Sequence, residues 1–376
     1  MTEWITRTIG DIATVFDGPH ATPQKTANGP WFLSISSLDN GRLDLEESAH
    51  LSESDFKKWT RRVTPQEGDL LFSYETRLGD AALMPAGLQA CLGRRMGLLR
   101  PYRDRVDPRF LLYTYLGPEF QNEIKARAIH GATVDRIPLV DLPKWPIRVP
   151  SLEQQQAVVE ILSALDEKLA LNKRIATNAL SLGRAILKKY IWNENREVAV
   201  SDIADLTYGK ALPAPKRKAG ETPVFGCTGQ VGWHDSALTD TACPVVGRKG
   251  ANAGHVSWMS KPGWVIDTAY HVRPISPDLT AEALYFILES AGFKDLVGDS
   301  AVPGVNRHLA LRHLIRIPSN AELKSFCEYA NNLLKVSVSA DTENHTLASL
   351  RDTLLPQLVT GKLRIKDAER AVEEAV

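Results

Sequence analysis

The sequence predicts an α+β fold in which two related domains alternate with a pair of long antiparallel coiled-coil helices. A long stretch with the apolar spacing of such a helix occurs twice, and the β-like runs before each copy follow the same order. At 376 residues, the chain also exceeds what one simple core accommodates. The predicted segments are a first domain at 1–149, a long helix at 150–192, a second domain at 193–317, a second long helix with a terminal segment at 318–365, and a mobile tail at 366–376.

Short β-like runs separated by turns make up most of the first domain. The strongest strand candidates are Trp31–Ser36, Gly68–Tyr74 and Cys91–Arg100, and Asp107–Lys125 has a helical pattern. We therefore expect an α+β domain with a mixed or antiparallel sheet.

The first long helix is predicted to begin at a capping box formed by Ser151 and Gln154. Apolar positions then alternate in spacings of three and four, which is the periodicity of a coiled coil. This seam consists of Val158, Ile161, Leu165, Ile175, Ala179, Leu182 and Ile186, interrupted by the polar Lys168 and Asn172.

The second domain repeats the framework of the first. Asp202 follows Asp11 by 191 residues (202 − 11 = 191), and each stands in a similar tetrapeptide before a β-like run. We further match Val305-Asn306-Arg307 with Val134-Asp135-Arg136. The sequences between these matched points differ widely. This pattern is typical of one scaffold that carries two different binding surfaces.

The second long helix repeats the first 168 residues later (319 − 151 = 168), since Ser319 and Glu322 take the places of Ser151 and Gln154. Two such helices in one chain favour an intramolecular antiparallel pair, and a dimerisation coil is the alternative. Polar residues interrupt both seams, and they either fix the register of the pair or face solvent. At the constant offset, the second seam consists of Phe326, Tyr329, Leu333, Val336, Ala340, Leu347, Leu350 and Leu354, with Glu343 as its polar interruption.

Composition and motifs argue against a self-contained enzyme, and we predict no catalytic residue and no metal site. The four cysteines form no CxxC pair, which suits a reducing cytoplasm and no zinc cluster. The glycine-rich run Gly247–Gly254 precedes a β-like segment, whereas a phosphate-binding loop needs a helix there. Neither HExxH nor GxSxG occurs, and no apolar run is long enough to span a bilayer.

Basic residues in turns are the candidates for nucleic-acid contacts. Arg and Lys can pair with guanine O6 and N7, and Asn with adenine N6 and N7. For any one of these residues, simple solvation of a surface side chain is the alternative. Because 45 basic and 45 acidic residues balance, a DNA-binding face must concentrate its cations or borrow charge from a partner. The candidates are Lys25, Arg77, Arg94, Arg95 and Arg136 in the first domain, and Lys216, Arg217, Lys218, Arg248, Lys249, Asn252, Asn306 and Arg307 in the second.

The whole chain resembles the specificity (S) subunit of type I restriction–modification systems. The resemblance is carried by the order of domains and helices, by Ile147–Gln156 (IRVPSLEQQQ) entering the first helix, and by Leu358–Ile365 (LVTGKLRI) ending the second. One departure is Glu322-Leu323-Lys324, which stands where the first copy has three glutamines.

The resemblance implies two target-recognition domains, held apart by the helix pair, that read a split and asymmetric sequence in double-stranded DNA. It implies a non-catalytic, cytoplasmic chain with two adenine-N6 methyltransferase (M) subunits and restriction/translocase (R) subunits as partners. S-adenosylmethionine, ATP and Mg2+ would belong to those partners, with no cofactor in this chain. The family has no shared base-contact motif, so it adds no residue to the candidates.

Three other readings compete with this one. A fused methyltransferase–nuclease would need a cofactor-binding fold that the sequence lacks. A non-DNA protein scaffold would use both domains to bind protein. A standalone two-headed DNA-binding regulator would bind DNA tightly without partners.

Overall fold

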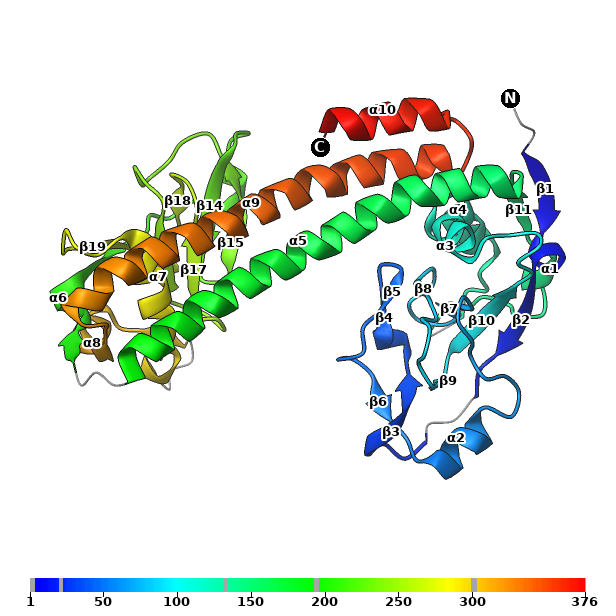
Figure 1. Ribbon diagram of the computed structural model, residues 1–376, viewed down its shortest axis with the longest axis horizontal. Coiled ribbons are helices and arrows are strands. Elements are labelled where there is room, and N and C mark those ends of the chain that lie inside the picture. The colour runs from blue at the N-terminus through cyan, green and yellow to red at the C-terminus, as the bar shows by residue number, and fades with distance from the viewer. Residues whose placement is uncertain (1–3, 20–22, 132–133, 193–195, 299–302, 376) are drawn as a thin grey trace. The chain divides into compact units, whose positions relative to one another are not determined.

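The computed structural model describes the chain except for residues 1–3, 20–22, 132–133, 193–195, 299–302 and 376 (Figure 1). It divides into two compact units. Unit 1 is Met1–Leu169 with His345–Val376, and unit 2 is Ala170–Asn344. The long helices α5 (Leu152–Trp192) and α9 (Asn320–Leu358) each contribute one part to each unit. The buried faces of both helices belong to the cores of the two units.

Unit 1 contains a four-stranded sheet in the order β2-β10-β7-β8, a three-stranded sheet β6-β3-β9, and the pair β1-β11. The expected helix at Asp107–Lys125 is two helices, because Gly117 and Pro118 separate them. The elements are β1 (Ile5–Thr8), α1 (Ile9–Ile12), β2 (Ala13–Asp17), β3 (Thr26–Leu33), η1 (Ile35–Ser37), β4 (Leu38–Asp39), β5 (Arg42–Leu43), β6 (Ala49–His50), α2 (Glu53–Trp59), β7 (Leu70–Ser73), β8 (Ala81–Leu83), β9 (Ala90–Leu92), β10 (Met96–Pro101), α3 (Pro108–Leu116), α4 (Pro118–Arg127), η2 (Leu142–Lys144) and β11 (Pro146–Val149).

Unit 2 repeats this topology, with a four-stranded sheet β13-β19-β16-β17, a three-stranded sheet β15-β14-β18 and the pair β12-β22. In both units the three-stranded sheet includes a parallel pair, β3 with β9 and β14 with β18. The elements are β12 (Glu197–Ala199), α6 (Val200–Ile203), β13 (Ala204–Tyr208), η3 (Ala214–Lys216), β14 (Thr222–Gly226), β15 (Gly229–His234), β16 (Cys243–Gly247), β17 (Val256–Met259), β18 (Trp264–Val265), β19 (Ala269–Pro274), α7 (Ala281–Ser290), η4 (Phe293–Leu296), β20 (Val297–Gly298), β21 (Gly304–Val305), α8 (Arg307–Arg312) and β22 (Leu314–Arg316).

The predicted duplication is visible in matched hydrogen bonds. The Asp11 carboxylate accepts from the backbone N–H of Thr8 at 2.8 Å, and Asp202 accepts from that of Ala199 at 3.0 Å. Each contact caps the one-turn helix that precedes the first strand of the large sheet. The α+β fold class with two related domains and a helix pair is thereby confirmed.

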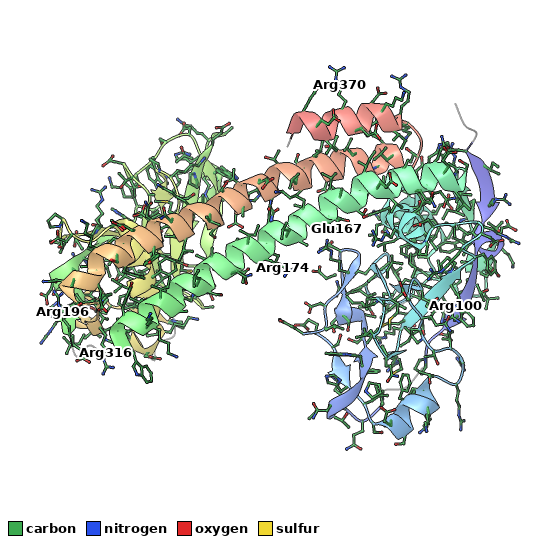
Figure 2. The ribbon with its side chains drawn as sticks, viewed as in Figure 1. Arg100, Glu167, Arg174, Arg196, Arg316 and Arg370 are labelled. Carbon is green, nitrogen blue, oxygen red and sulfur yellow. The ribbon has the colours of Figure 1, made fainter. Side chains whose placement is uncertain are left out.

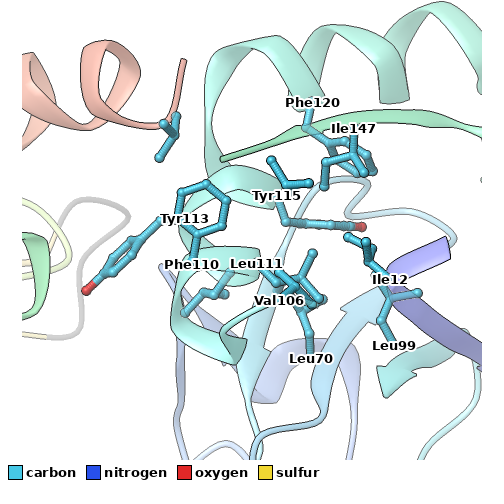
Figure 3. Close-up of a cluster of buried hydrophobic side chains, with 14 of the residues drawn as sticks. Ile12, Leu70, Leu99, Val106, Phe110, Leu111, Tyr113, Tyr115, Phe120 and Ile147 are labelled. Carbon is cyan, nitrogen blue, oxygen red and sulfur yellow. The ribbon is translucent and has the colours of Figure 1, made fainter. Parts of the chain in front are cut away.

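The core of unit 1 packs the large sheet against α3, α4 and the unit 1 parts of α5 and α9 (Figure 3). Tyr115 lies at its centre, with ring centroids 4.9 Å from Phe120 and 5.8 Å from Phe72. On the sheet, the buried carboxylate of Asp69 accepts two hydrogen bonds from the Arg100 guanidinium, at 2.9 and 2.7 Å. Arg100 is labelled in Figure 2. This bidentate pair satisfies a carboxylate that burial would otherwise destabilise.

The core of unit 2 contains an aromatic cluster at the helix pair. Phe326 of α9 lies 6.2 Å from Phe286 of α7 and 6.3 Å from Tyr190 of α5, measured between ring centroids. Gly183 of α5 lies directly against the Phe286 ring, so that a Cβ there would be 2.5 Å from Cε1. The glycine therefore gives α7 room to approach the long helix.

The predicted helix seams are correct at about every second position. In α5, Val158 and Leu165 are buried, and in α9, Phe326, Leu347 and Leu354 are buried. Several other seam positions are wrong, because they lie exposed on the helix pair of unit 2 (Ile175 37%, Leu182 51%, Tyr329 49%, and also Val336 46% exposed). Ile161, Ile186, Leu333 and Leu350 are intermediate in burial.

Small residues explain these errors. From the buried Asn172, the α5 seam continues to Ala176, Ala179 and Gly183, all of which are buried. The predicted pattern includes Ala179, but it passes over Ala176 and Gly183 and steps to the neighbouring Ile175 and Leu182. Small side chains at a helix interface let the neighbouring backbone approach closely, so they lie in the seam although they are weakly apolar.

The parts of α5 and α9 within unit 2 run antiparallel, as contacts at two levels show. Asn172 donates to the Glu343 carboxylate at 2.8 Å, and further along α5 Tyr190 meets Phe326. Asn172 is only 2% exposed. Two residues predicted to interrupt the seams therefore contact each other across the helix pair.

The prediction of a mobile tail is wrong for Ile365–Ala375, which form helix α10. Ala368 of this helix is fully buried in the unit 1 core, and Ala371 and Val372 pack against it. The turn before α10 contains Gly361 at φ +70°, where a Cβ would collide with the Trp4 indole. Most residues of this tail are charged or polar, but one narrow apolar face is enough to pack a helix on a core.

Candidate nucleic-acid interface

Most of the predicted contact residues lie at one edge of each large sheet, which we call the loop edge. In unit 1 the loop edge comprises the β7–β8 turn at 74–80, residues 93–95 before β10, and residues 134–137. In unit 2 it comprises the β16–β17 turn at 248–255, residues 266–268 before β19, and residues 304–307. Backbone hydrogen bonds join the three segments in each unit.

The two loop edges share one backbone framework. Tyr74 N donates to Arg95 O at 3.0 Å in unit 1, and Arg248 N donates to Thr268 O at 2.8 Å in unit 2. Ile137 N donates to the carbonyl of Tyr74 at 2.8 Å, and Val305 N to that of Arg248 at 2.9 Å. Tyr74 is therefore equivalent to Arg248.

The same bonds correct one predicted correspondence. They align Val305 with Ile137, three residues beyond the predicted partner Val134. Asn306 and Arg307 are therefore equivalent to Pro138 and Leu139 rather than to Asp135 and Arg136. A three-residue motif with two identical residues is too short to set the register of a loop.

In unit 1, two candidate arginines are held by the protein itself. Arg77 donates to the carbonyls of Ile35 and Leu38 at 3.1 and 3.0 Å. Arg95, at φ +72°, pairs with Glu75 at 2.9 Å and donates to Thr76 Oγ1 at 3.2 Å. These contacts fix the β7–β8 turn against its neighbours.

The remaining unit 1 candidates, Arg94, Arg136 and Lys25, are exposed, and within the described part of the chain no hydrogen bond or ion pair engages their side chains. Arg94 and Arg136 lie on the loop edge. Lys25 precedes β3 and does not belong to the loop edge.

In unit 2, Arg248 is clamped at the start of the β16–β17 turn. Its guanidinium lies 4.8 Å from the ring centre of Tyr208 and donates to Asp267 O at 2.9 Å. Lys249 and Asn252 follow in the same turn and are exposed. A rigid arginine followed by two exposed hydrogen-bonding side chains is an arrangement that can present donors to a base edge.

Two other candidates on the unit 2 loop edge have structural contacts instead. The Asn306 side chain caps α8 by accepting from His308 N at 2.8 Å. Arg307 donates to Leu206 O at 2.5 Å and to the Asp205 carboxylate at 2.8 Å. Both residues thus hold α8 and the adjoining loop in place.

Lys216, Arg217 and Lys218 precede β14, and Arg217 and Lys218 contact β15 and the residue that follows it rather than the loop edge. Arg217 donates to Val231 O at 2.6 Å, and Lys218 pairs with Asp235 at 3.6 Å. Lys216 is exposed. The structure therefore does not bring this basic tripeptide into the same contact network as Arg248 and Lys249.

Sequence reasoning missed two exposed aromatic residues that accompany cations. Tyr208 is 49% exposed beside Arg248, and Trp233 is 50% exposed with Lys261 Nζ 5.3 Å from its ring centre. Exposed aromatic rings next to cations are typical of surfaces that contact nucleic acids. Their position at strand ends gave no signal, because buried and exposed aromatic residues look alike in a β-like run.

A cavity of about 530 Å³ in unit 1 lies beside α3 and the long helices, and most of its charged residues are paired with one another. Asp166 accepts from Arg351 at 3.1 Å and from the Tyr113 hydroxyl at 2.9 Å. Burial, together with the adjacent Asp166, raises the pKa of Tyr113 well above its ordinary value. We read this network as the attachment of the unit 1 sheet to its helices.

Among the described residues, no cluster of three or more His, Cys, Asp or Glu could hold a metal ion. Within the part of the chain that the structure describes, no helix is both long enough and apolar enough to cross a membrane. These observations leave the loop edges as the main candidate site.

Comparison with known proteins gives one family match. Residues 1–180 match the family described as type I restriction modification DNA specificity domain, which agrees with the resemblance drawn from the sequence.

Two similar proteins can be compared with this chain in sequence and in fold. A putative type I restriction enzyme MjaX specificity subunit from Methanocaldococcus jannaschii is 26% identical over 182 residues, which is 46% of this chain and 42% of that protein. The match thus spans less than half of the relative's length. The S subunit of a type I restriction–modification system from M. genitalium shares the fold with a TM-score of 0.68 and 18% identity, covering 95% of this chain and 96% of that one.

Proposed function

We propose that this chain directs two methyltransferase (M) subunits and the restriction/translocase (R) subunits of a type I complex to a bipartite, asymmetric site in double-stranded DNA. In this proposal each unit reads one half of the site through its loop edge. The observation that carries the proposal is the pair of loop edges, which have the same backbone hydrogen bonds but different side chains. One scaffold with two side-chain sets suits two unlike half-sites.

In the same proposal, the long helices act as the ruler between the half-sites. Helix α5 has 41 residues, which corresponds to about 60 Å at 1.5 Å per residue. One turn of B-DNA is about 34 Å long, so helices of this length are on the scale of a bipartite site. The spacer length would then depend on the helices and not on the sequence between the half-sites.

The chain itself would supply recognition and no chemistry. Its zero net charge supports a need for partners that contribute cations to the phosphate backbone. S-adenosylmethionine, ATP and Mg2+ would be bound by those partners. We accordingly expect no S-adenosylmethionine binding by the isolated chain in isothermal titration calorimetry.

The decisive experiment is to express the chain with its methyltransferase partner and map N6-methyladenine across a genome. We expect one asymmetric two-part motif with a fixed spacer. Exchange of residues 193–317 for the same region of another specificity subunit should change one half of that motif only. A motif in which both halves change would contradict the proposal.

DNA binding separates this function from the two non-enzymatic alternatives. Salt-sensitive binding of duplex DNA only in the presence of M subunits supports the proposal. Tight binding by the chain alone would indicate a standalone regulator. An absence of binding with and without M subunits would indicate a protein scaffold.

A further inference from the structure

We infer that Lys249 in unit 2 and Glu75 in unit 1 occupy one equivalent base-reading position with opposite hydrogen-bond polarity. Lys249 would read a guanine in one half-site, and Glu75 would read a cytosine in the other. The inference rests on the proposed function and adds to it the residues that set specificity and the base that each prefers.

The equivalence follows from backbone pairing. Glu75 forms an isolated bridge with Arg136, and Lys249 forms one with Gly304. In each unit the preceding residue accepts a hydrogen bond from the residue after the bridge partner, Ile137 in unit 1 and Val305 in unit 2. The two side chains therefore leave the same point of the same backbone framework.

The charge at this position is reversed between the two units, and the residues around it also differ. Beside Glu75 stands Arg95, which pairs with its carboxylate at 2.9 Å. The residue equivalent to Arg95 is Thr268 in unit 2, so Lys249 has no acidic or basic counterpart at that point. At another equivalent pair, unit 1 has Asp17 where unit 2 has Tyr208.

Framework positions do not show such reversals. The strands that lead into the two turns are β7, with the sequence LLFS, and β16, with the sequence CPVVG, and both are wholly buried. A charge reversal confined to the exposed edge of a matched fold does not serve folding, because neither side chain is needed to form the backbone bonds. Two DNA half-sites of different sequence would require such a charge reversal.

The local geometry holds Lys249 for recognition. Arg248 is fixed on one side by the Tyr208 ring and by Asp267 O. On the other side Gly250, at φ +107°, donates from its N–H to Pro303 O at 2.9 Å. Lys249 is thus an exposed side chain on an immobilised backbone, which lowers the entropy lost when it binds a base.

The chemistry assigns a base to each residue. The Lys249 ammonium is a donor without acceptor capacity, and in the major groove it matches guanine O6 and N7. The Glu75 carboxylate is an acceptor and matches the cytosine N4 amino group. Arg95 pairs with this carboxylate at 2.9 Å and orients it, and is a positioning residue in this scheme.

The test uses the full chain in complex with its methyltransferase partner. Duplexes are selected from a library randomised at every position of the wild-type motif, and N6-methyladenine is mapped in cells. Lys249→Ala should relax one guanine position of one half-site by about fivefold to 150-fold in base preference, leaving the other half-site and the spacer unchanged. Lys249→Arg should keep the guanine, because an arginine guanidinium also donates to guanine O6 and N7.

Matched variants separate base reading from general effects. Lys324→Ala removes an exposed lysine on α9 in the same unit and should leave the motif unaltered. Glu75→Gln, which exchanges an acceptor for a mixed donor and acceptor, should change one cytosine position of the other half-site, with adenine gaining.

Three results would overturn the inference: an unchanged motif for Lys249→Ala, a change in both half-sites, or uniform loss of binding to all duplexes. The last result would make Lys249 a phosphate anchor. If the wild-type complex yields no two-part motif, the proposed function itself fails. A wild-type two-part motif that Lys249→Ala leaves intact refutes only this inference.

Discussion

Substitution of Gly183 by alanine tests how closely α7 packs on the long helix α5 in unit 2. In a free helix, Gly→Ala stabilises by about 1 kcal/mol, because alanine loses less backbone entropy. Here the added Cβ would lie 2.5 Å from Phe286 Cε1 and 3.1 Å from Cε2, well inside van der Waals contact. The structure therefore predicts that the sign of the usual effect is reversed.

The Phe286 ring is buried and packed against other aromatic rings. It is 1% exposed and makes edge contacts with Tyr285 and Phe326, at 5.1 and 6.2 Å between centroids. Forcing a methyl group into such a site costs about 1–3 kcal/mol. After the gain in helix propensity, we expect a net destabilisation of about 0–2 kcal/mol.

Hydrogen exchange with mass spectrometry is the appropriate assay, because a chain with two units need not unfold in one step. In Gly183→Ala, the amides of α7 and of Ala170–Trp192 should exchange faster, while those of unit 1 stay unchanged. Ser181→Ala, at an exposed position two residues away, is the control and should be neutral or slightly protective. Equal or slower exchange in Gly183→Ala than in Ser181→Ala would refute the packing argument.

Three further predictions concern ionisable groups. Arg351→Ala leaves the largely buried Asp166 without its cation and should destabilise unit 1 by about 1.5–3 kcal/mol in urea unfolding. Burial lowers the pKa of His271, so the unfolded state binds its proton at higher pH than the folded state. Unit 2 should lose stability as pH falls below about 6.5, and His271→Gln should flatten that part of the pH profile. Among the thiols, Cys227 should react with iodoacetamide first, because burial raises the pKa of Cys91 to about 12.

Each of these has a result that contradicts it. For Arg351, the Asp166→Asn and Arg351→Ala double variant should be less destabilised than the sum of the single ones, and strict additivity would show that the pair does not interact. For His271, a midpoint of urea unfolding that is constant between pH 7 and pH 5 would exclude the burial argument. For the thiols, equal labelling of Cys91 and Cys227 in the folded chain would do so.

Repeated local patterns made much of the architecture predictable. Asp11 and Asp202 fix the alignment of the two units, because each caps the turn before the first strand of its large sheet. The capping serines likewise locate the starts of both long helices within a residue or two. Such signals depend on neighbours three residues apart, and the sequence displays those neighbours directly.

The interface could be predicted only in part, because its contacts join distant segments. Arg77 bonds to Leu38 O across 39 positions, and Arg307 to Leu206 O across 101. No pattern in the sequence distinguishes these arginines from the exposed Arg94. The prediction of the helix seams was wrong at some positions for a related reason. The burial of Ala176 depends on which surface packs against it and not on its own apolarity.

The contact between Asn172 and Glu343 has a consequence for length. A slip of the two helices by one heptad would move α9 by about 10 Å along α5, roughly three base-pair steps of DNA. It would also place Asn172 opposite Val336 or Leu350, where its buried amide would find no acceptor side chain. This single hydrogen bond therefore disfavours the neighbouring alignments and selects one register for the helix pair.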